Sequence, residues 1–128
     1  MQIGITHTVY SEVTDQNTAM AISSGAVRVF GTPMMAALME DAALRLVAPY
    51  LEEGQTTVGI ALNLTHTAAT PVGMRVEATA VLTEIDGKTL TFSVSAKDEC
   101  GLIGECIQKR AIVNLERFTE KTYQKLNR

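Results

Sequence analysis

The chain has 128 residues, of which 46% are hydrophobic and 20% are charged. This length and composition suit one domain with a conventional core, and they exclude a disordered protein, a collagen-like repeat and a disulfide-stapled miniprotein. Eleven basic residues against fourteen acidic ones give a net charge of −3, which favours neither a nucleic-acid partner nor an anionic membrane surface. We therefore expect a single domain, residues 1–128, that binds neither of them.

The N-terminal segment and the cysteines indicate a compartment. Met1–His7 lacks the charged region and the continuous apolar run of a secretory signal, and no later apolar segment is long enough to span a bilayer. Cys100 and Cys106 match neither a CxxC redox pair nor a zinc site, so we expect free thiols. The sequence predicts a cytoplasmic protein with no metal and no redox cofactor.

The first two predicted elements are a strand and a long helix. Apolar residues alternate with polar ones over Ile3–Val9, which is the period of a half-buried strand. After a looser stretch, the one long helix is predicted over Thr32–Ala48, with Thr32 as its N-cap, Pro33 at the first helical position and Pro49 ending it. This helix is hydrophobic nearly all round, so we expect it to be buried.

The acidic residues of this helix lie on different sides of it. Asp41 and Arg45 have the i,i+4 spacing of an ion pair. Glu40 projects about 100° away from Asp41, on the side that is rich in alanine and other apolar residues. An acid in that position is costly to bury and calls for a reason.

Four strands are predicted beyond Gly54. In the first, one face is expected to carry Val58, Ile60, Leu62, Leu64 and His66. The second has its apolar face over residues 74–82, and the third has its apolar face over residues 90–96, with Asp86–Gly87 as the hairpin turn between them. The last strand covers about Leu102–Leu115 with a bulge in its register, and a short polar helix follows over Phe118–Leu126.

One strand, one long apolar helix and four antiparallel strands form an α+β arrangement. Because the helix is apolar on most sides, the antiparallel sheet must wrap around it, which is the hotdog fold. Such a sheet leaves unpaired edges and an incompletely covered helix. We therefore expect two copies to pair into a continuous sheet, that is, a homodimer.

Three polar residues stand where the pattern calls for apolar side chains or a cap: Thr32, Glu40 and His66. Each has an ordinary structural interpretation, as a helix cap, a neutralised acid and a hydrogen-bonded core histidine respectively. Taken together, a carboxylate, a histidine and a hydroxyl converging beside a helix N-terminus form a plausible acyl-transfer site.

Four segments resemble the fluoroacetyl-CoA thioesterase family of hotdog proteins: Val29–Glu40, Ala48–Glu52, Thr65–Gly73 and Arg110–Phe118. The most specific of them contains the run His-Thr-Ala-Ala-Thr-Pro at positions 66–71. The resemblance implies hydrolysis of a short acyl-CoA thioester, with CoA as part of the substrate and no other cofactor.

The resemblance also implies the site residues. Thr32, Glu40 and His66 match the family's threonine, glutamate and histidine. Gly59 matches a glycine whose backbone amide faces the acyl group, and Arg110 matches an arginine near the substrate or coenzyme. In chemical terms, Glu40 would attack the thioester or activate water, His66 would move protons, and Thr32 would orient Glu40 or hydrogen-bond the intermediate.

The chain departs from the family just before Thr32. The fluoroacetyl-CoA enzyme has phenylalanines there that gate and line the acyl pocket, whereas Ala21–Ala26 contains none. This difference predicts another, or a broader, short-chain acyl group.

Two other functions stay open at this point. One is a non-catalytic module that binds an acyl-CoA or a small acid, although the presence of all three polar residues argues mildly against it. The other is a hydratase or dehydratase, because fold alone does not fix chemistry. No hydratase-type motif surrounds His66.

Overall fold

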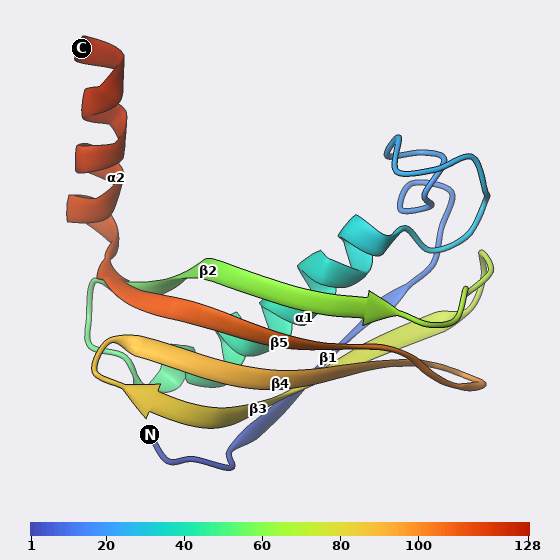
Figure 1. Ribbon diagram of the computed structural model, residues 1–128, viewed down its shortest axis with the longest axis horizontal. Helices are drawn as coiled ribbons and strands as arrows, with labels where there is room; N and C mark the ends of the chain where they lie inside the picture. Colours follow the sequence, from blue (N-terminus) through green and yellow to red (C-terminus); the bar gives the residue numbers. More distant parts are fainter.

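The computed structural model describes all residues, 1–128, as a curved sheet with one long helix against its concave face (Figure 1). The elements are β1 (Thr6–Glu12), α1 (Thr32–Val47), a 3₁₀ turn (Ala48–Tyr50), β2 (Gln55–His66), β3 (Arg75–Asp86), β4 (Thr89–Asp98), β5 (Gly101–Asn114), α2 (Leu115–Tyr123) and a second 3₁₀ turn (Gln124–Asn127). The observed elements confirm the predicted α+β class.

The five strands form one antiparallel sheet in the order β1-β3-β4-β5-β2. β1 and β2 are therefore the two edges. On β2, Ile60 is 54% exposed and Leu62 is 38% exposed, so this edge presents apolar side chains together with unpaired backbone groups. Exposed edges of this kind are templates for pairing with another strand.

The core lies between α1 and the central strands. α1 packs against β3, β1 and β4 and, to a smaller extent, β2. Its buried residues meet the apolar faces predicted for β3 and β4, and both of those faces are confirmed. The helix contributes Met35, Met39, Ala42, Ala43, Leu46 and Val47, and the strands contribute Val76, Ala78, Ala80, Leu82, Leu90, Phe92, Val94 and Ala96.

The helix is where the sequence predicts it, but its cap is not. Gly31 is the N-cap and makes no side-chain cap bond, while Thr32 is the first helical residue and Pro33 follows it. The N-cap prediction for Thr32 is wrong because its hydroxyl bonds a histidine on another element. The predicted i,i+4 ion pair is confirmed, with Arg45 Nε 2.9 Å from an Asp41 carboxylate oxygen.

The predicted faces of β2 are partly wrong. The register against β5 shifts between Gly59 and Ala61, which makes Ile60 a bulge residue. Strict alternation would put Val58 on the same face as His66. The extra residue reverses the faces of the residues before it, so Thr57 and Gly59 lie on the helix side with His66 and Val58 lies on the other face. The bulge predicted in the last strand is confirmed, because β5 has an extra residue, Ile103, opposite the shift at Ala96 and Lys97.

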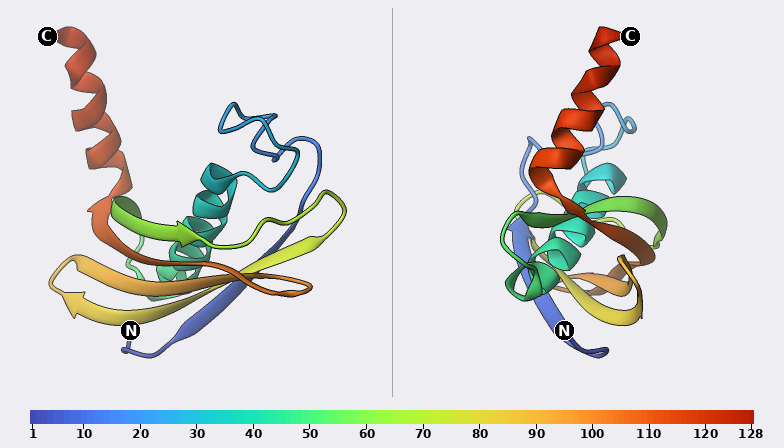
Figure 2. Two further views of the ribbon diagram at one scale, coloured as in Figure 1. Left: turned by 45° about the vertical axis from the view of Figure 1, so that its right-hand side comes forward. Right: turned by 90° about the vertical axis from the view of Figure 1, so that its left-hand side faces the viewer.

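The two end elements differ in their bounds from the prediction. β1 lies three residues further along than expected, and Ile3 is 56% exposed. The C-terminal helix begins at Leu115, because the Asn114 side chain accepts a hydrogen bond from the Arg117 N–H and caps it. Figure 2 shows α2 standing away from the sheet. No helix of this fold combines the length and apolar character that crossing a bilayer requires.

Candidate active site

The first cluster of the site joins α1 to the end of β2. Thr32 lies on the first turn of α1, and its Oγ1 is 2.7 Å from Nδ1 of His66, the last residue of β2. The two residues are 34 positions apart in sequence, so the pair depends on how the helix start sits over the sheet edge. The predicted proximity of these two residues is thus present in the structure.

His66 is placed to exchange protons. Burial lowers the pKa of its imidazole below the usual 6.5, so the ring is mainly neutral at pH 7. The Ala68 backbone beside the ring offsets part of this lowering of the pKa. Nδ1 is bonded to Thr32, and the buried Nε2 has no partner that meets hydrogen-bond geometry, so Nε2 is the ring nitrogen left for proton exchange with a ligand that reaches it.

A cavity of about 300 Å³ opens beside this pair. Its wall consists of Thr32, His66, Thr67 and Phe30 together with small and aliphatic residues of the loop after β2 and of the segment between β1 and α1. Those residues include Ala19, Gly25, Val27 and Val29. The cavity therefore puts an apolar surface directly next to the hydroxyl and the imidazole, which suits a small apolar group.

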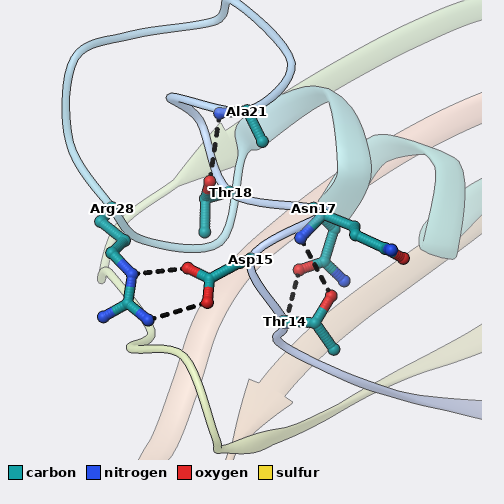
Figure 3. Close-up of polar contacts among 7 residues, drawn as sticks. Thr14, Asp15, Asn17, Thr18, Ala21 and Arg28 are labelled. Carbon is teal, nitrogen blue, oxygen red and sulfur yellow. Dashed lines mark hydrogen bonds and ion pairs between the residues drawn. The ribbon is translucent and has the colours of Figure 1, made fainter.

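The segment that walls the cavity is held by its own polar contacts (Figure 3). The Arg28 guanidinium donates two hydrogen bonds to the Asp15 carboxylate and lowers the pKa of that carboxyl below its usual range. The Ala21 N–H donates to Thr18 Oγ1 at 3.1 Å. Gly31 fits closely where the segment enters α1, because a Cβ there would lie 2.8 Å from an Ile22 methyl carbon.

The second cluster centres on Glu40, in the middle of α1. Its Oε2 is 3.4 Å from Arg110 Nη1, and its side chain remains 44% exposed. Gly59 of β2 lies directly beneath the carboxylate, where a Cβ would be only 2.7 Å from Oε2. Glu40, Gly59 and Arg110, which the family resemblance selects, are therefore in contact with one another.

Arg110 belongs to the interior of this cluster. It is 5% exposed, and burial lowers the pKa of its guanidinium although the charge of Glu40 raises it in part. Its Nε donates to Thr57 Oγ1 at 2.9 Å, its Nη2 donates to the Thr57 carbonyl at 3.1 Å, and its Nη1 lies 3.5 Å from Gln108 Oε1. The guanidinium is turned toward Glu40, not toward bulk solvent.

Thr57 and Gln108 are polar residues that our sequence reasoning did not single out. Both are buried. Cys106, Gln108 and Arg110 occupy every second position of β5 and share its inner face. A polar residue at such a core-facing position could have identified Gln108 from the sequence. Thr57 gave no such signal, because the bulge at Ile60 hides which face it occupies.

The two clusters do not meet within one chain. Thr32 and Glu40 are eight residues apart on α1, which is about 12 Å along the helix axis at 1.5 Å per residue. No hydrogen bond joins Glu40 to Thr32 or His66. The sequence-based expectation that all three residues converge is therefore met only for Thr32 and His66 in the single chain.

The remaining thiols and acids give no metal centre. Burial, with a smaller contribution from the charge of Glu40, raises the pKa of Cys106 to about 11. Cys100 is exposed, and both cysteines are free. No group of three or more histidine, cysteine, aspartate and glutamate side chains is arranged to hold an ion.

Comparison with known proteins connects this geometry to a family. Residues 13–116 match the family model described as fluoroacetyl-CoA-specific thioesterase. The fluoroacetyl-CoA thioesterase of Streptantibioticus cattleyicolor is 46% identical over 97 residues, which are 76% of this chain and 70% of that protein. The chain belongs to the fluoroacetyl-CoA thioesterase family.

Solved structures of this family and of the wider thioesterase superfamily superpose closely on the chain. A solved structure of the fluoroacetyl-CoA thioesterase FlK has a TM-score of 0.92 at 38% identity, over 98% of this chain and 97% of that chain. A Thermus thermophilus member of the thioesterase superfamily has a TM-score of 0.89 at 26% identity, covering 98% of this chain and 93% of its own. The hotdog fold and the class of enzyme, a thioesterase, predicted from the sequence are confirmed.

Proposed function

We propose that this family member hydrolyses short-chain acyl-CoA thioesters to the free acid and CoA. The observation that carries the proposal is the Thr32–His66 pair, whose unpartnered imidazole nitrogen is buried beside an apolar cavity. One related structure, of an FlK mutant that is 39% identical, holds fluoroacetate and CoA. That complex supports a CoA ester as the substrate class.

The chemistry follows from the charge and position of each group. Glu40 is a half-buried carboxylate that either adds to the thioester carbonyl or removes a proton from the attacking water. Neutral His66 transfers protons between water and the departing thiolate, and Thr32 orients it through Nδ1. Backbone N–H groups at the start of α1 supply donors for the oxyanion that forms on the carbonyl.

The cavity favours an acyl group that is not restricted to fluoroacetyl. No aromatic side chain occurs in Ala21–Ala26, and the one phenylalanine that lines the cavity, Phe30, is 2% exposed and is also part of the core. Small residues such as Ala19 and Gly25 line the space in front of His66. We therefore expect acetyl to butyryl esters to be accepted, with no large preference for the fluorinated one.

We also infer a homodimer, because the edge of the sheet and the divided site call for the same partner. Antiparallel pairing of β2 with a second β2 would bury the exposed side chains of Ile60 and Leu62. If the two-fold axis passes Asn63 and the bulge at Ile60 is kept, Gly59 lies opposite the partner's His66.

That register would complete the catalytic set. Glu40, which lies over Gly59, would then approach the partner's Thr32 and His66. Each of the two sites would take its carboxylate from one chain and its hydroxyl and imidazole from the other. Glu40 and Thr32 of one chain can then be about 12 Å apart along α1 while each acts on a substrate together with residues of the other chain.

The cytoplasm is the proposed location, supported by the two free cysteines, which a reducing compartment maintains. We propose that the protein acts without a metal or redox cofactor. The proposed partners are an acyl-CoA and a second copy of the chain.

The direct test is thiol release from acetyl-, butyryl-, hexanoyl- and fluoroacetyl-CoA by the wild type and by Glu40→Gln. Asp41→Asn is the matched control, because it removes one negative charge from the next helix position, where the acid is paired with Arg45. We expect release by the wild type and the control, and a loss of at least about a hundredfold in Glu40→Gln. Binding of CoA esters without release would instead identify a binding module.

A further inference from the structure

We infer that Thr57 and Gln108 are positioning residues that hold Arg110 beneath Glu40 and thereby fix the reactive carboxylate. This inference rests on the proposed function of Glu40 and extends it to two residues that make no hydrogen bond to the carboxylate themselves. It starts from an unusual feature of the core. On the inner face of β5, a buried glutamine and a buried arginine occupy successive inward positions, Gln108 and Arg110.

The packing explains why polar side chains are found there. α1 packs against β3, β1 and β4, whereas side chains bridge the distance between α1 and β5. Gln108 makes this bridge directly, since its Nε2 donates to the Met39 carbonyl of α1 at 2.9 Å. The bond is one residue before Glu40, so it sets the height and rotation of the helix at that point.

Thr57 fixes the other side of the guanidinium. Its hydroxyl accepts from Arg110 Nε at 2.9 Å and its carbonyl accepts from Nη2 at 3.1 Å, so one residue of β2 binds two edges of the planar group. This arrangement leaves Nη1 as the nitrogen directed at Glu40 Oε2, and Gln108 Oε1 lies 3.5 Å from the same Nη1. A planar guanidinium held at several points has little freedom to move.

Gly59 completes the cradle from below. Because a Cβ there would lie 3.5 Å from Arg110 Nη1 and 2.7 Å from Glu40 Oε2, the strand backbone approaches both charged groups. The carboxylate is thus confined between the strand and the guanidinium while its side chain remains open to solvent on the remaining side. Confinement of this kind is what a nucleophile or base needs to be preorganised.

The test uses substitutions that keep volume and remove hydrogen bonds. Thr57→Val removes the hydroxyl, and Thr57→Ser retains it. Gln108→Met removes the amide at nearly constant volume. We expect kcat for acetyl-CoA to fall about tenfold or more in Thr57→Val and Gln108→Met, KM to stay within about twofold, and Thr57→Ser to retain most of the activity.

A second readout does not depend on activity. The Arg110 Nε–H should give a resolved ¹H–¹⁵N resonance, protected from solvent exchange in the wild type and in Thr57→Ser, identified by its loss in Arg110→Lys. Protection should be lost in Thr57→Val. Absence of turnover in the wild type would refute the proposed function. Protection of the Arg110 Nε–H from solvent exchange would then test by itself whether Thr57 holds the guanidinium in place.

Two results would overturn the inference. One is a folded Thr57→Val or Gln108→Met protein with wild-type kcat, and the other is equal loss in Thr57→Ser and Thr57→Val. If Thr57→Val does not fold, Gln108→Met carries the kinetic test with the same expected loss. The resonance of Arg110 in Thr57→Ser then serves as the reference.

Discussion

Replacing Gly59 by alanine should disable the enzyme while leaving its fold intact. The new Cβ would meet Glu40 Oε2 at 2.7 Å, and an ordinary contact needs about 3.4 Å, so the carboxylate must move by about 0.7 Å or more. Misplacement of a reacting group by about 1 Å can cost roughly a hundredfold in rate. We therefore expect kcat/KM to fall between about tenfold and a hundredfold, or about 1.4–2.7 kcal/mol in activation free energy.

Stability should change little in the same variant. The φ of Gly59 is not positive, so alanine adopts this strand conformation without strain. The lower entropy of the unfolded alanine chain favours folding by about 0.4–1 kcal/mol, which offsets the cost of displacing one flexible side chain. Thermal unfolding should therefore stay within a few degrees of the wild type.

The assay is thiol release from acetyl-CoA over a range of concentrations, with thermal unfolding measured on the same preparation. Val58→Ala is the control, because it changes the neighbouring residue on the opposite face of β2. A folded Gly59→Ala protein with kcat/KM within twofold of the wild type would refute the placement of Glu40 over this glycine.

Three other outcomes follow from the site and the sheet edge. Because burial lowers the pKa of His66 and its neutral form is the base, kcat/KM should rise with pH along a limb centred below pH 6.5 and then level off; a midpoint above 6.5 would contradict this. Iodoacetamide at pH 8 should modify Cys100 and spare Cys106 in the native protein, since a pKa of about 11 leaves only about one thiol in a thousand ionised; mass spectrometry showing equal labelling would be the opposite result. Ile60→Lys should yield a monomer without activity by analytical ultracentrifugation and thiol release, whereas an active monomer would speak against a shared site.

Much of the fold was predictable because its elements have strong local signals. The long helix is marked by Pro33 and by a continuous apolar composition, and the alternation in β3 and β4 gives their buried faces directly. The faces of β2 were predicted incorrectly before Ile60, because a bulge is specified by pairing with β5 and leaves no mark in the strand's own alternation.

The site was predictable residue by residue and not as an arrangement. Thr32, Glu40 and His66 were selected as polar residues in apolar surroundings and by the family resemblance. The separation of Thr32 from Glu40 follows from eight residues of helix, about 12 Å, and was available from the sequence. Which of these two residues meets His66 depends on the register between α1 and β2, and periodicity does not contain that register. Local rules favoured an N-cap role for Thr32, and a long-range hydrogen bond to His66 prevailed over it.

The measurement that tests the account most directly is activity after mixing two inactive variants, Glu40→Gln and His66→Ala. If each site takes Glu40 from one chain and His66 from the other, every mixed dimer has one intact site. Random exchange of subunits at equal concentrations should then restore about a quarter of the wild-type rate. No recovery, in a mixture where tag-based capture demonstrates mixed dimers, would contradict a catalytic set divided between two chains.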